Sequence, residues 1–92
     1  MKLLTKRNLA KLDQDSILYI FVIQEKEVWQ LRCYNGAYYF ALLSCPETNS
    51  NRKWDSEQDA IQDEFTRYPK NKIYLFDNMK EFYAAAVKNG WE

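Results

Sequence analysis

Residues 17–43 read ILYIFVIQEKEVWQLRCYNGAYYFALL, a succession of apolar runs with two short polar breaks. The runs at 16–24, 28–34 and 37–43 are rich in β-branched and aromatic residues, as is typical of β-strands. The second break, Asn35-Gly36, is the strongest short signal for a two-residue hairpin, because a type I′ turn requires positive φ at both central positions. The sequence therefore predicts an antiparallel meander of three strands.

The two turns determine which side chains share a face of the sheet. A two-residue turn at Asn35-Gly36 pairs Trp29 with Leu42, and a two-residue turn at Glu25-Lys26 pairs Trp29 with Val22. Side chains alternate along a strand, so a shift of one residue would mix the two faces. The two registers agree on one nearly pure apolar face, which we expect to be the core face: Leu18, Ile20, Val22, Trp29, Leu31, Cys33, Tyr38, Phe40 and Leu42.

The opposite face of the meander is mixed, and in this register it places Arg32 between Tyr19 and Tyr39. It is too apolar to stand bare in water, because a large exposed apolar patch usually marks a contact surface. Three coverings are possible: the N-terminal segment, another protein chain (including a second copy), or single-stranded nucleic acid stacked on the aromatic rings. The predicted partner-binding residues are Tyr19, Phe21, Gln30, Arg32, Tyr34 and Tyr39.

The segments on either side of the meander contain one short helix pattern and one loop pattern. Residues 5–13, TKRNLAKLD, predict a short basic helix with a thin leucine stripe. Residues 44–53, SCPETNSNRK, are polar and contain proline, and they predict a loop.

The C-terminal half predicts two capped helices with a strand between them. Residues 54–68 have apolar positions at helical spacing, with Ser56 as the N-cap and Pro69 as the stop. Residues 72–76, KIYLF, predict a short strand. The last helix, 79–89, has Asp77 or Asn78 as its cap, and Asn78 with Glu81 fits the capping-box spacing. Gly90 is its left-handed end, with Trp91 folding back as a clamp.

These elements predict one α+β domain over residues 1–92, in the order α-β-β-β-α-β-α. We expect the fourth strand to join an edge of the meander. We also expect both C-terminal helices to cover the pure apolar face, giving two layers.

The composition argues against most catalytic and cofactor chemistry. The chain has no histidine and only two glycines, so histidine-based catalysis and glycine-rich phosphate loops are absent. Cys33 and Cys45 are too few for a structural zinc site. In the predicted sheet they lie roughly 24 Å apart, at ~3.4 Å per residue, which predicts free thiols. We therefore expect no catalytic residue, no metal and no cofactor, and a reducing, cytoplasmic location.

Charge and hydropathy narrow the class of partner. Thirteen basic residues balance thirteen acidic ones, whereas a general nucleic-acid binder would carry a basic excess. No apolar run reaches the length of a membrane span. An acidic docking strip, Asp55, Asp59 and Asp63, has the spacing of one helix face, although a solvated face is the simpler interpretation. The sequence thus favours a non-enzymatic protein-binding domain whose partner is another protein or a second copy in a homodimer, with single-stranded nucleic-acid binding as the alternative.

Overall fold

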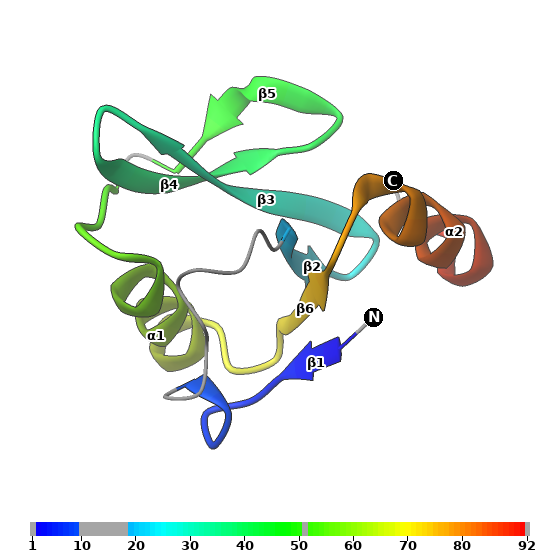
Figure 1. Ribbon diagram of the computed structural model, residues 1–92, viewed down its shortest axis with the longest axis horizontal. Helices are drawn as coiled ribbons and strands as arrows, with labels where there is room; N and C mark the ends of the chain where they lie inside the picture. Colours follow the sequence, from blue (N-terminus) through cyan, green and yellow to red (C-terminus); the bar gives the residue numbers. More distant parts are fainter. Residues whose placement is uncertain (1, 10–18, 51, 92) are drawn as a thin grey trace.

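One six-stranded antiparallel sheet lies between two helices in the computed structural model, which describes residues 2–9, 19–50 and 52–91 (Figure 1). The strand order across the sheet is β1-β6-β2-β3-β4-β5. Neither described helix is long and apolar enough to cross a membrane. In chain order the elements are β1 (Lys2–Leu4), β2 (Tyr19–Gln24), β3 (Glu27–Tyr34), β4 (Ala37–Leu42), β5 (Cys45–Asn49), α1 (Glu57–Arg67), β6 (Lys72–Phe76) and α2 (Met79–Asn89).

The predicted meander and both of its registers are confirmed. Asn35 and Gly36 have φ angles of 51° and 78°, as the two-residue turn requires. Trp29 pairs with Leu42 on β4 and with Val22 on β2. The side chains therefore divide between the two faces as the alternation predicts.

The predicted N-terminal helix is wrong over its described part, and the chain begins with a strand. β1 pairs with β6, and Leu4, which follows Leu3 in that strand, is only 3% exposed. A single turn follows, in which the Asn8 N–H donates to the Thr5 carbonyl oxygen at 3.0 Å. Residues 10–13 of the predicted helix lie outside the described residues. Pairing with β6 satisfies backbone groups and buries Leu4, and this tertiary gain outweighs the weak helical pattern.

Two further expectations about the sheet are wrong. The predicted loop contains β5, an exposed edge strand that pairs with β4 through an irregular register at Ala41 and Leu42. β6 does join the meander, beside β2, but it is not the edge strand that we expected, because β1 pairs with its other side. Its side chains explain this position: Ile73 and Phe76 are almost fully buried on opposite faces, as a central strand requires.

The prediction of two layers is also wrong, because the helices lie on opposite faces of the sheet (Figure 1). α1 covers the pure apolar face, where Ala60 and Ile61 pack with Val22 and Phe40. The element order is therefore β-β-β-β-β-α-β-α, and the fold is a mostly-β α+β domain.

α2 covers half of the mixed face, through its one fully buried residue, Phe82. Phe82 stacks on Phe21 of β2 with ring centroids 4.1 Å apart, and its edge meets Phe76 of β6 at 5.4 Å. Met79 and Trp91 pack around this cluster. The mixed face needs this helix because β2 and β6 place phenylalanines on it.

The helix ends follow the predicted capping residues. The Ser56 hydroxyl accepts from the Asp59 N–H at 3.1 Å, and the Asn78 side chain accepts from the Glu81 N–H at 2.8 Å. After Gly90, whose φ is 70°, the Trp91 N–H donates back into the last turn of α2. The Trp91 ring lies 5.3 Å from the Tyr74 ring, which confirms its role as a structural clamp.

We expect Phe82→Ala to lower the free energy of unfolding by about 3–5 kcal/mol, because it leaves a cavity against Phe21 and Phe76. Urea unfolding monitored by circular dichroism measures the change. Val87→Ala, at a position of α2 that is 85% exposed, is the control and should change stability by less than about 0.5 kcal/mol. Equal effects of the two substitutions would show that α2 does not seal this face.

Candidate functional site

The structure removes one of the predicted partner-binding residues from the surface. Phe21 is 0% exposed, because Phe82 of α2 stacks on it. Tyr19 is half-buried against the same cluster and pairs with Phe76 of β6. The prediction that Phe21 contacts a partner is therefore wrong, and Tyr19 offers only part of its ring.

The outer half of the mixed face, on β3 and β4, extends beyond α2. Tyr34 is 70% exposed, and Arg32 pairs with the half-buried Tyr39 on the neighbouring strand. Gln30 is half-buried at the last described pair between β2 and β3. A shallow hollow of about 200 Å³ opens beside these residues, and Tyr34, Tyr39 and Lys53 are in its wall. We call Arg32, Tyr34, Tyr39 and Lys53 the aromatic patch.

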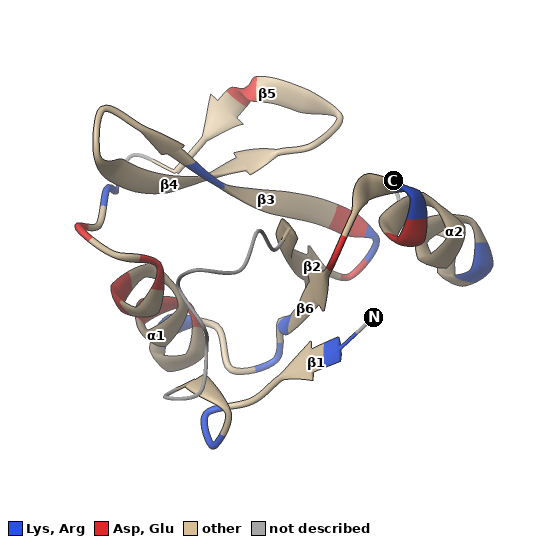
Figure 2. Cartoon of the chain, viewed as in Figure 1, with Lys and Arg blue, Asp and Glu red and all other residues tan. Residues whose placement is uncertain are grey.

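The predicted acidic strip is not continuous. Glutamates and aspartates do gather around α1 (Figure 2). However, Asp55 precedes the helix, which begins at Glu57, so it does not share a helix face with Asp59. Asp63 is already paired within the protein, because both of its carboxylate oxygens accept from Arg67 Nε at 3.0 Å. Of the three, Asp59 alone both lies on α1 and is exposed, since Asp55 is exposed but precedes the helix.

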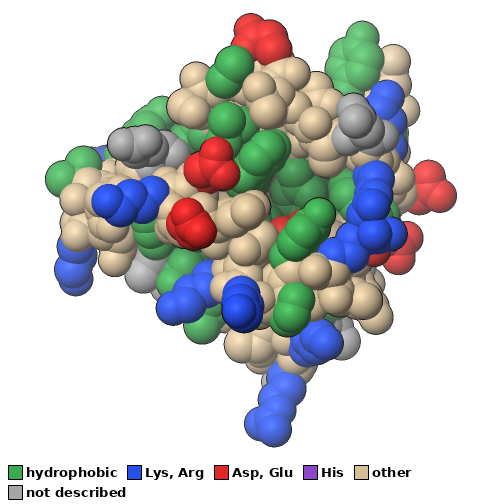
Figure 3. All heavy atoms as spheres, turned by 180° about the vertical axis from the view of Figure 1, so that it is seen from behind, with side chains coloured by type: hydrophobic (Ala, Val, Ile, Leu, Met, Phe, Trp, Pro, Cys, Tyr) green, Lys and Arg blue, Asp and Glu red, His purple; other side chains and the backbone are tan. Residues whose placement is uncertain are grey.

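The structure contains a cleft that the sequence did not predict, between α1 and the apolar face of the sheet. It encloses about 370 Å³. The sheet contributes Val22, Trp29 and Phe40, and the connection before α1 contributes Trp54. Seen from this side, hydrophobic side chains lie in a hollow with lysine and arginine side chains next to it (Figure 3). We call this hollow the α1 cleft.

Trp54 holds the connection that forms one wall of the α1 cleft. Its backbone bridges to Tyr38 of β4 through two hydrogen bonds of 2.8 and 2.9 Å. Its ring meets Phe40 edge-on at 5.6 Å. Because Trp54 is bound to the sheet, α1 begins three residues later than the predicted 54–68 helix. Its first residue is Glu57, directly after the N-cap Ser56. The cap was the only signal in the sequence that placed Trp54 outside the helix.

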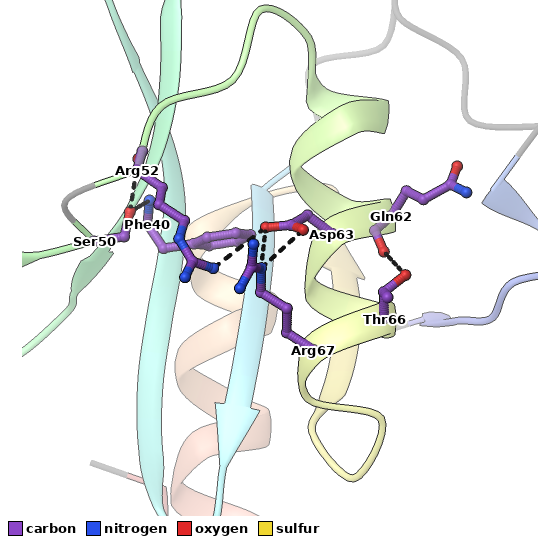
Figure 4. Close-up of polar contacts among 7 residues, drawn as sticks. All are labelled: Phe40, Ser50, Arg52, Gln62, Asp63, Thr66 and Arg67. Atoms are coloured by element: carbon purple, nitrogen blue, oxygen red, sulfur yellow. Dashed lines mark hydrogen bonds and ion pairs between the residues drawn. The ribbon is translucent and has the colours of Figure 1, made fainter.

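Two arginines reach the mouth of the α1 cleft from different elements. Ser50 accepts from the Phe40 N–H and donates to the Arg52 carbonyl oxygen, both at 3.1 Å, which fixes the chain just before α1. The Arg52 and Arg67 side chains then meet at Asp63 (Figure 4), with an ion-pair distance of 3.7 Å for Arg52 and 3.0 Å for Arg67. Sequence spacing alone indicates only the Asp63–Arg67 pair, which is four apart on α1.

Trp29, which lines the α1 cleft, has a buried donor with no partner among the described residues. The indole nitrogen of Trp29, Nε1, is inaccessible and makes no hydrogen bond. Such a group costs free energy and is uncommon in native proteins. The accessible donors of the α1 cleft are therefore the two guanidinium groups at its mouth, those of Arg52 and Arg67.

Glu64 also lines the α1 cleft, and its environment perturbs its ionisation. Burial raises the pKa of Glu64, and the neighbouring charge of Asp63 acts in the same direction. The Asn71 amide donates to Glu64 at 3.0 Å and partly opposes this rise in pKa. Among the described residues there is no group of three acidic, cysteine or histidine side chains placed to hold a metal ion.

We expect Glu64→Gln to remove a pH-dependent term from stability. The raised pKa means that the folded protein holds this proton more tightly than the unfolded chain. The contribution of Glu64 to stability is therefore full below its unfolded pKa and declines as pH rises through the folded value. The wild-type minus Glu64→Gln difference in unfolding free energy, measured in urea from about pH 4 to about pH 8, should fall with pH.

Glu47→Gln provides a control of opposite sign. Hydrogen bonds from its own backbone N–H and from the Cys45 thiol lower the pKa of Glu47. The corresponding difference for Glu47 should therefore rise with pH. A Glu64 difference that also rises would contradict the buried environment described above.

No family model matches the chain, and comparisons with curated proteins and with solved structures give no significant match.

Proposed function

We propose that this protein is a small non-enzymatic binding domain that contacts a protein partner through the aromatic patch. The observation that supports this proposal most directly is Tyr34, a large ring that is 70% exposed next to Arg32 on a two-strand hairpin. Tyrosine and arginine are the residue types most often found at the energetic centres of protein interfaces.

The partner surface that suits the aromatic patch is acidic. The patch carries Arg32 and Lys53, both exposed, and two tyrosines whose hydroxyls accept or donate hydrogen bonds. The hairpin is closed at one end by the Asn35-Gly36 turn, and along its length β3 pairs with β4. Tyrosines on such a frame lose little conformational freedom on binding, which favours affinity.

Protein binding is favoured over single-stranded nucleic acid. A nucleic-acid platform stacks successive bases across neighbouring strands. Here α2 lies over Phe21, and Tyr19 is half-buried against the same cluster, so Tyr34 and Tyr39 remain on the open half. The equal numbers of acidic and basic residues in the chain also give no general attraction for phosphates. The free, exposed thiols of Cys33 and Cys45 suit a cytosolic, reducing compartment.

The double substitution Arg32→Ser with Tyr34→Ser tests the proposal. A photo-crosslinking amino acid placed at Tyr39 should form a defined adduct with one partner in native extract, and the double substitution should reduce that adduct about tenfold or more. The matched control is Tyr83→Ser, at an exposed tyrosine of α2 on the other half of this face. Thermal unfolding should show that both variants keep the fold.

Three results would overturn the proposal. An adduct that the control removes as fully as the double substitution would show that the aromatic patch is not the contact. A crosslink only between two copies, together with a dimer in sedimentation, would assign the patch to self-association. Saturable binding of a mixed-sequence oligonucleotide that the double substitution abolishes would assign it to nucleic acid.

A further inference from the structure

The α1 cleft has the size and lining of a small-molecule site. Its volume of about 370 Å³ lies at the lower end of the range for such sites, roughly 300–1,000 Å³. Trp29, Phe40 and Trp54 form an aromatic interior, and polar groups stand at the mouth. This combination holds a flat apolar body inside and a polar group at the entrance.

The guanidinium donors at the mouth of the α1 cleft favour an anion. Two guanidinium groups, from Arg52 and Arg67, face a single carboxylate, that of Asp63. Asp63 takes the Nε–H of Arg67, while Arg52 lies at 3.7 Å, beyond hydrogen-bonding distance. Each guanidinium has five N–H donors, so most of these donors remain for a ligand. The two side chains are about half exposed, which keeps those donors within reach.

Glu64 is the carboxylate of the cleft wall that is paired with neither Arg52 nor Arg67, and it opposes this preference. It lines the same cleft but accepts from Asn71, so it is oriented by a group in the connection between α1 and β6. A cationic ligand would find aromatic rings here too. However, it would meet both arginines at the mouth, and Asp63 is already paired with them. The formal charges of Arg52, Arg67, Asp63 and Glu64 balance, so the preference for a ligand that supplies acceptors rests on the guanidinium N–H donors that remain unused.

The geometry points to the α1 cleft as a binding site for a small carboxylic acid with a flat apolar body. The carboxylate lies between the guanidinium groups of Arg52 and Arg67, which suit its planar, two-oxygen geometry. The apolar body packs against Trp54, Phe40 and Trp29. Asp63 acts as a positioning residue that holds the two arginines at the mouth.

Three probes of the same shape and different charge test this site: 3-phenylpropionate, 3-phenylpropylamine and 3-phenylpropanol. The indole N–H signals in nuclear magnetic resonance spectra report binding. We expect 3-phenylpropionate to shift the Trp29 and Trp54 signals saturably. The Trp91 signal is an internal control, because that ring packs on Tyr74 and Phe82 at the opposite face and should not move. The alcohol and the amine should bind at least about tenfold more weakly.

Substitutions assign the anion contact to the two arginines. The double substitution Arg52→Gln with Arg67→Gln should weaken 3-phenylpropionate binding about tenfold and leave binding of the alcohol unchanged. Glu64→Gln should strengthen binding of the acid, because it removes an opposing charge. Arg7→Gln is the matched control, at an exposed arginine outside the cleft wall.

The inference is overturned if the alcohol or the amine binds as tightly as the acid, or if the acid binds the double variant as tightly as wild type. It is also overturned if no probe moves the Trp29 and Trp54 signals. Unfolding curves of the variants separate a lost contact from a lost fold. These results are independent of the aromatic patch, which lies on the other face of the sheet.

Discussion

A strand with apolar side chains on both faces requires cover on both faces, and β6 imposes this requirement on the whole domain. Ile73 faces the cluster beneath α1, while Phe76 faces the cluster beneath α2. Backbone groups of such a strand must also be paired on both edges, so β1 and β2 lie on either side of it. Two neighbouring strands and both helices are therefore placed by the burial of one five-residue strand.

This arrangement divides each face of the sheet into a covered half and an open half. On the mixed face, the stack of Phe82 on Phe21 closes the part over β2 and β6, while the β3–β4 hairpin extends past it. On the apolar face, α1 packs through Ala60 and Ile61, and the space beside it is bounded by Trp54 and Phe40. The aromatic patch and the α1 cleft are these two open parts, on opposite faces.

The two surfaces differ in physical character and therefore in the ligands that suit them. The aromatic patch is shallow and exposed, and such a surface suits a macromolecular partner that can cover it with a large contact area. The α1 cleft is a hollow with an aromatic interior and an arginine pair at its mouth, which suits a compact ligand with one charged end. Each arginine of that pair comes from a different element, and Asp63 brings them together.

Local chemistry made several features predictable from the sequence alone. Asn35-Gly36 determined the hairpin register, and with it which residues share a face. A type I′ turn requires positive φ at two successive positions, which Asn tolerates and Gly adopts freely. Ser56 and Asn78 marked the helix starts because their side chains bond the nearby backbone. These interactions span at most a few residues, so their sequence spacing is sufficient to identify them.

What only the tertiary structure decided is where elements meet that are distant in the chain. The Lys2–Leu4 segment became a strand because β6 offers it backbone partners some seventy residues away, which no local pattern records. α2 took the mixed face because Phe82 fits between Phe21 and Phe76, three residues from three elements. The charged mouth of the α1 cleft forms in the same way, because Arg52 and Arg67 come from different parts of the chain and converge on Asp63. Local propensity indicates whether a segment favours helix or strand. Burial and strand pairing between residues that are distant in the sequence determine which element forms and which faces of the sheet remain open.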